Sequence, residues 1–213
     1  MIRLAEIALA LAGLCFVFYP AIRPFSDETT LQGAVAFASS SWVLAHSLAM
    51  VGFILLTLGL FGLYLRLQGT AVEGSSLLAL VLTGVGIGLT LPYYGAETFG
   101  LHAIGQEALG RGDPTLILLA GSVRFGEGVY FFGVGLILLA VGTVLAAVAV
   151  WRSEILPRWS GVLLAVAFVL FIPQFFTPQY MRVAHGFLIT VGCLWLAWGM
   201  ARSGESPEGH PTV

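Results

Sequence analysis

The chain alternates between long uncharged apolar runs and short polar stretches, and this alternation predicts its secondary structure. An α-helix that crosses a bilayer needs roughly 20 apolar residues, and the runs have about this length. They lack the ten-residue alternation of a membrane β-barrel, and an unpaired backbone amide in lipid costs several kcal/mol, so we expect helices. Six transmembrane helices are predicted, at Leu4–Ile22, Trp42–Leu65, Leu77–Glu97, Arg124–Trp151, Trp159–Phe176 and Tyr180–Ala201.

Composition places the chain among membrane proteins. Hydrophobic residues make up 58% of it and charged residues 9%, whereas about a quarter of the residues in a soluble domain are charged. We therefore expect an all-α, polytopic membrane domain over residues 1–202, with the lipid bilayer as its surroundings. The polar, Pro- and Gly-containing residues 203–213 are predicted to form a disordered tail. A net charge of −2 and the absence of lysine argue against nucleic acid as a partner, and no feature indicates a protein partner.

Orientation follows from one short loop. Arg152 and Arg158 lie between Trp151 and Trp159, a combination typical of a cytoplasmic loop flanked by interfacial aromatic residues. With six helices, this loop predicts that both termini are cytoplasmic. The long connection Thr98–Val123 is then on the outer side.

Local signals indicate where helices begin and what the cysteines do. The serines at Ser39–Ser41 precede the second apolar run and are predicted to cap its helix. Pro157 and Pro178 stand near the start of the fifth and sixth runs, where a missing backbone N–H costs little. Cys15 and Cys193 both fall inside apolar runs, so we expect small buried side chains and no disulfide.

One stretch resembles a known family. Ser153–Leu164, "SEILPRWSGVLL", is similar to the S-x-x-LPR-x-x-GVLL pattern that joins the fourth and fifth helices in the domain of unknown function 4386 family, and Gly62–Leu67, "GLYLRL", is similar to a second, looser feature of it. The resemblance implies a six-helix protein of a bacterial inner membrane. It implies no reaction, because the family has no assigned activity to carry over.

Ionisable residues gather at one predicted depth. His46, Glu97, Glu127 and His185 come from four helices and fall within roughly one turn of the outer boundary. Such groups cost a few kcal/mol in lipid unless they are paired or face a cavity. We therefore predict an outward-facing polar pocket walled by these four residues.

Further polar side chains are predicted at the rim of this pocket. They are Tyr94, His102, Arg124 and Arg182. Arg124 precedes Glu127 by three residues and Arg182 precedes His185 by three, so on continuous helices each pair shares a face.

Two classes of function are consistent with this pattern. In the first, the pocket binds a small lipid-like ligand with a polar head, a haem, or a transition metal held by His46 and His185, since imidazole and carboxylate suit such ions. In the second, the protein is a non-catalytic structural or accessory membrane subunit whose polar residues tie helices together. The sequence contains no HExxH, GxSxG or Walker motif, so whether the chain is an enzyme stays open.

Overall fold

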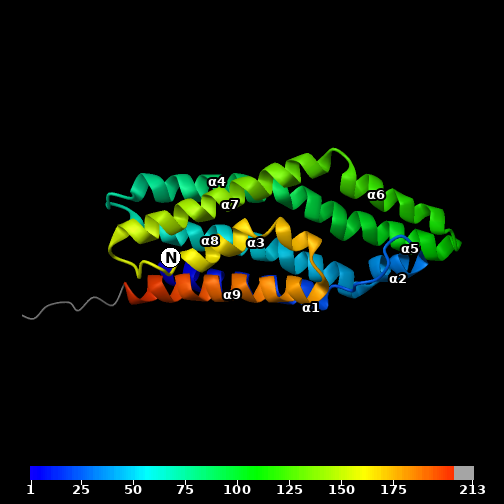
Figure 1. The fold of residues 1–213 in the computed structure, drawn as a ribbon, viewed down its shortest axis with the longest axis horizontal. Coiled ribbons are helices and arrows are strands. Elements are labelled where there is room, and N and C mark those ends of the chain that lie inside the picture. Colours follow the sequence, from blue (N-terminus) through cyan, green and yellow to red (C-terminus); the bar gives the residue numbers. More distant parts are fainter. Residues whose placement is uncertain (204–213) are drawn as a thin grey trace, which may run out of the picture.

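The computed structural model describes residues 1–203, and all regular secondary structure in this part of the chain is helical, without a strand (Figure 1). The predicted tail over 203–213 lies outside the described residues except for Ser203. The helices are α1 (Ile2–Ile22), α2 (Leu31–Ala38), α3 (Ser40–Leu67), α4 (Glu73–Gly95), the π-helix η1 (Ala96–Gly100), α5 (Leu101–Arg111), the 3-10 helix η2 (Pro114–Ile117), α6 (Leu118–Phe125), α7 (Gly128–Ser153), α8 (Val162–Val169), the 3-10 helix η3 (Pro173–Phe176) and α9 (Gln179–Arg202).

Five helical segments are long and apolar enough to cross a membrane. They are α1, α3, the continuous stretch Glu73–Arg111, α7 and α9. At 1.5 Å per residue, the 39 residues of Glu73–Arg111 extend about 58 Å. A bilayer core is about 30 Å thick, so this segment continues well past one, and the predicted helix end at Glu97 was wrong.

The predicted fifth span, Trp159–Phe176, is not one helix. Regular α-helix covers only the eight residues of α8, and a turn then leads into η3. Pro173 has no N–H to donate to Val169, and the Phe171 N–H bonds to the Phe168 carbonyl instead of continuing the α-helical pattern. At about 12 Å, α8 alone is too short to cross a bilayer.

The helices form two closely packed groups, with α1 against both α3 and α9, and α4 against α7. Glycines mark the closest approaches. A Cβ atom on Gly135 of α7 would lie 2.6 Å from the Gly86 carbonyl of α4, so only a residue without a side chain fits there. Small residues of this kind let transmembrane helices approach one another closely.

Both described ends of the chain lie at the same end of the bundle. Met200 near the end of α9 reaches the Ala5 and Gly62 region, where α1 begins and α3 ends. The connection after α7 lies at this end too, because Gly199 near the end of α9 packs on Ser160 and Pro157. From there the chain returns along α7, and Phe175 of η3 reaches Phe132 with ring centroids 5.7 Å apart.

At the other end, α2, α5, η2 and α6 form a small helical cap (Figure 1). It has its own apolar cluster, which includes Phe37, Leu101 and Ile117 and extends to Trp42 in the first turn of α3. That turn starts as predicted, since the Ser39 hydroxyl accepts a hydrogen bond from the Trp42 N–H at 3.1 Å. The cap covers the end of the bundle where the predicted polar residues lie.

Candidate functional site

The site is built around one carboxylate, Glu97. Arg124 of α6 donates two hydrogen bonds to it, from Nε to Oε1 at 2.7 Å and from Nη2 to Oε2 at 3.1 Å. This fork-to-fork arrangement is the strong geometry of an arginine–carboxylate pair. Glu97 is only 8% exposed, so the pair ties the cap to the bundle in a largely dry environment.

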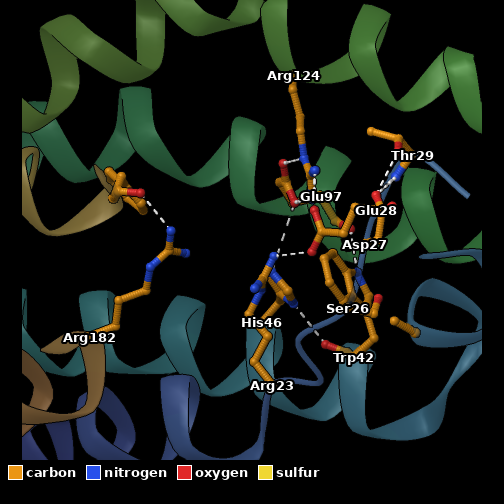
Figure 2. A network of polar contacts seen from close by, with 12 residues as sticks. Arg23, Ser26, Asp27, Glu28, Thr29, Trp42, His46, Glu97, Arg124 and Arg182 are labelled. Atoms are coloured by element: carbon orange, nitrogen blue, oxygen red, sulfur yellow. Dashed lines mark hydrogen bonds and ion pairs between the residues drawn. The ribbon is translucent and has the colours of Figure 1, made fainter. Parts of the chain in front are cut away.

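The pair extends into a chain of four charges. Arg124 also contacts Glu28 in the loop after α1, and Glu28 bonds to Arg23 at 2.7 Å. Burial alone would lower the pKa of Arg124, yet the hydrogen bonds and charge of Glu97, followed by those of Glu28, hold this pKa above its ordinary value. Figure 2 shows the guanidinium of Arg124 between the two carboxylates, with Arg23 and His46 reaching in from the opposite side.

Glu97 is placed by an irregular backbone. It lies in the π-helix η1, where the wider turn interrupts the α-helical pattern between α4 and α5. Single π-turns of this kind are frequent at functional sites. The backbone carbonyl of Glu97 accepts a 2.8 Å hydrogen bond from the Trp42 indole N–H, so α3 fixes both the position and the depth of this turn.

His46 faces the same carboxylate. Its Nδ1 is 2.9 Å from the Trp42 carbonyl, and because a carbonyl only accepts, Nδ1 carries the proton. In the neutral imidazole Nε2 then holds a lone pair, and this atom is 3.9 Å from Glu97 Oε2. The separation is too long for a direct hydrogen bond.

Aromatic faces support the arginines. The guanidinium of Arg23 lies over Phe25 and Trp42, at 4.6 and 4.7 Å from the ring centroids, and that of Arg124 lies 5.3 Å from Phe37. Cation–π contacts of this kind stabilise partly desolvated charges. The arginines are therefore held in place by the cap as well as by their carboxylates.

A cavity of about 520 Å³ opens beside this network. Its polar end is lined by Tyr19, Arg23, Glu28, His46, Tyr93, Tyr94, Glu97, Arg124 and Arg182. Its apolar wall is formed by Phe125, Val129, Phe132, Gly133, Leu136, Ile172, Phe175 and Phe176. The buried hydroxyl of Tyr94 has no hydrogen-bond partner within the described chain.

Arg182 enters the cavity from α9. Its Nε donates to the Thr177 carbonyl at 3.0 Å and its Nη2 to the Phe175 carbonyl at 2.5 Å. Both partners are neutral carbonyls, one in η3 and one just after it. Among residues 1–203, Arg182 forms no ion pair, and Figure 2 shows it apart from the charge network.

The predicted residues thus divide into two sets. The structure brings His46, Tyr94, Glu97, Arg124 and Arg182 to one cavity. It places His102 elsewhere, with Nδ1 2.8 Å from the Phe37 carbonyl of α2, where it joins two elements of the cap.

Glu127 is a correction. Its predicted pairing with Arg124 assumed one continuous helix, but α6 ends at Phe125 and α7 begins at Gly128. A side chain on Gly126 would meet the Ser122 carbonyl, with the Cβ only 2.5 Å away. The chain therefore turns at this glycine, Glu127 is exposed, and Arg124 pairs with Glu97 and Glu28 instead.

His185 is a second correction. It was predicted to meet His46, but its Nε2 lies 2.7 Å from the Ala167 carbonyl, which the interruption after α8 leaves without its usual N–H donor. It lines a different, open groove of about 320 Å³ with residues such as Pro173 and Leu188. The predicted site for a metal or haem between these two histidines is not formed, and within residues 1–203 no three His, Cys, Asp or Glu side chains cluster to hold a metal ion.

Sequence reasoning missed Arg23, Glu28 and Tyr19. Arg23 and Tyr19 end the first apolar run and look like ordinary interfacial residues, and Glu28 belongs to a polar loop. The only available signal for Glu28 was an acidic residue in the loop after a helix, and many solvated loops contain one.

Comparison with known proteins identifies no relative of this chain. No family model, no curated protein and no solved structure matches the chain.

Proposed function

We propose that this chain is a multi-pass protein of a bacterial inner membrane whose cavity binds an amphipathic, lipid-like small molecule. The observation that carries the proposal is the continuity of the cavity, which joins buried charged side chains to an apolar wall in one space of about 520 Å³. Binding pockets for small molecules combine these two kinds of lining, with a few polar groups to orient the ligand and apolar surface to hold it.

The membrane setting rests on five apolar helices of sufficient length. The return of the chain along α7 through α8 and η3 supports a sixth, interrupted passage, which is tolerated where protein buries the irregular backbone. The loop with Arg152 and Arg158 favours a cytoplasmic location for both termini. The bacterial inner membrane and kinship with the domain of unknown function 4386 family rest on the "SEILPRWSGVLL" stretch alone.

The charges of the site favour an acidic head on the ligand. Three arginines and two glutamates line the cavity, so with neutral His46 one positive charge is in excess. Arg23 and Arg124 have carboxylate partners, whereas Arg182 has none within the described chain. We place the head of the ligand at Arg182 and its chain along Val129, Phe132 and Leu136.

A purely structural role is the competing proposal, and it is supported by the internal pairing of Glu97 with Arg124. The two proposals differ in what they expect of the cavity. If the polar network is only structural, filling the cavity with a larger side chain should not affect ligand binding. If the cavity is a binding site, filling it should displace the ligand.

Gly133 offers the test. It lines the cavity, and a Cβ atom added there meets no atom within 4 Å. Gly133→Phe should fill the apolar end and weaken binding of a fluorescent anionic phospholipid, measured by titration of the detergent-solubilised protein, by about tenfold or more.

The matched control is Gly88→Phe, since Gly88 of α4 also has open space around its Cβ and lies outside the cavity. It should bind like the unaltered protein. Equal binding by both variants and the unaltered protein would contradict the proposal.

A further inference from the structure

Two hydrogen-bond acceptors face each other in the cavity without a donor between them. In the neutral imidazole His46 Nε2 holds a lone pair, because the Trp42 carbonyl keeps the one proton on Nδ1. Glu97 accepts two hydrogen bonds from Arg124 and is therefore a carboxylate. The 3.9 Å between Nε2 and Oε2 leaves room for a molecule that donates to both.

A vicinal diol matches this pair. Hydrogen bonds from hydroxyl groups are about 2.7–2.8 Å long, so two neighbouring hydroxyls can each donate to one of two acceptors at this separation. An ammonium group could donate to both as well. The excess positive charge of the cavity disfavours a cation and favours neutral hydroxyls near His46.

An anionic group has a separate place in the same cavity. The Arg182 guanidinium donates hydrogen bonds to backbone carbonyls from Nε and Nη2. Its Nη1 has no hydrogen-bond partner within residues 1–203. Arginine recognises phosphate through several N–H groups at once. A phosphate at Arg182 and hydroxyls at His46 would occupy the two ends of the polar lining.

We infer that the ligand is an anionic glycerophospholipid whose head carries a free diol, the chemistry of phosphatidylglycerol. Its phosphate contacts Arg182, its two hydroxyls donate to His46 Nε2 and Glu97 Oε2, and an acyl chain follows the apolar wall. This inference rests on the proposed function, since it names the class of molecule that the same cavity binds.

Competition between lipids with identical acyl chains tests which head group the cavity prefers. The detergent-solubilised protein is mixed with equal amounts of phosphatidylglycerol, phosphatidic acid, phosphatidylethanolamine and phosphatidylcholine, and bound lipids are counted by native mass spectrometry. Phosphatidylglycerol should exceed phosphatidic acid, which lacks the diol, by about tenfold. Equal occupancy by these two, or a preference for phosphatidylethanolamine, would overturn the inference and leave the cavity a lipid site.

Two variants assign the contacts. In His46→Asn the amide nitrogen replaces Nδ1 and keeps the donor for Trp42, while the Nε2 acceptor is lost. This variant should bring the ratio of phosphatidylglycerol to phosphatidic acid close to one and leave total anionic lipid unchanged. Arg182→Gln should lower both anionic lipids relative to phosphatidylcholine by about tenfold. An unchanged lipid ratio in His46→Asn would refute the diol contact.

A soluble polyol phosphate has the same head chemistry. Excess glycerol phosphate should not displace the bound lipid, because it cannot fill the apolar wall, and displacement would show that the site serves a soluble molecule. If the unaltered protein binds no lipid and Gly133→Phe changes nothing, the proposed function itself fails. The outcomes therefore separate failure of the head assignment from failure of the site.

Discussion

The bundle is hollowed in both halves, but the linings differ. Beneath the cap, a cavity of about 520 Å³ is lined by five charged side chains, whereas in the half near Met1 an open groove of about 520 Å³ between α7 and α8 is lined by apolar residues and Arg152. A Cβ atom on Gly199 would come within 2.9 Å of the Ser160 hydroxyl, and one on Gly161 within 2.9 Å of Ala147. At the other half, Gly133 of α7 faces open space. Glycine thus permits close packing at Gly161 and Gly199 and leaves room for the cavity at Gly133.

The charges follow the same division. Glu28, Glu97, Arg23, Arg124 and Arg182 all line the cavity in the cap half. Buried charges cost several kcal/mol each unless they are paired and hydrogen-bonded. Gathering two buried and three half-buried charges beside one cavity is therefore costly for a purely structural purpose. We propose that binding belongs to the half beneath the cap, where the pair of Glu97 and Arg124 also holds the cap to the bundle.

The largest effect is expected from Glu97→Gln. Removing one member of a buried ion pair leaves the other charge poorly compensated, so this change should lower the free energy of unfolding by about 3 kcal/mol, measured by thermal melting in detergent. The control is Glu127→Gln, which alters an exposed carboxylate and should stay within about 0.5 kcal/mol of the unaltered protein. A larger loss of stability in Glu127→Gln than in Glu97→Gln would indicate that Glu127 is the partner of Arg124.

Gly135→Leu should have the next largest effect. Its side chain would collide with the α4 backbone at Gly86, and overpacking of this kind costs about 1–3 kcal/mol. Gly133→Leu, two residues away on the same helix, enters open space and should leave the melting curve nearly unchanged. Similar losses in both variants would mean that α7 is as crowded toward the cavity as it is toward α4.

A smaller effect is expected at His185. His185→Phe removes the donor to the Ala167 carbonyl, and one such hydrogen bond contributes about 1 kcal/mol. Hydrogen exchange at Phe168–Phe171 should then be faster. His185→Gln places an amide N–H near the former Nε2 and should restore most of the protection. Equal exchange in both variants would show that the interruption after α8 does not depend on this contact.

The long helices could be predicted because an apolar run in lipid has no alternative to internal backbone hydrogen bonding. The same rule led to the wrong continuous helix at Trp159–Phe176, since neighbouring helices and the His185 side chain supply partners that hydropathy does not show. The predicted depth of Glu97 in the membrane was enough to identify it as a candidate site residue. Its partners could not, because Arg124 and Glu28 are brought to it by the cap, whose position depends on the π-turn at Ala96–Gly100 and on Trp42.

The most direct test of the account is an experimental structure of the protein in nanodiscs of phosphatidylglycerol and phosphatidylcholine. We predict elongated density in the cavity, with its head between Arg182 and His46 and its tail along Phe132 and Leu136. A cavity that holds only water, or one closed by contact of Phe132 with Ile172, would contradict the claim that the cap half is built around a ligand.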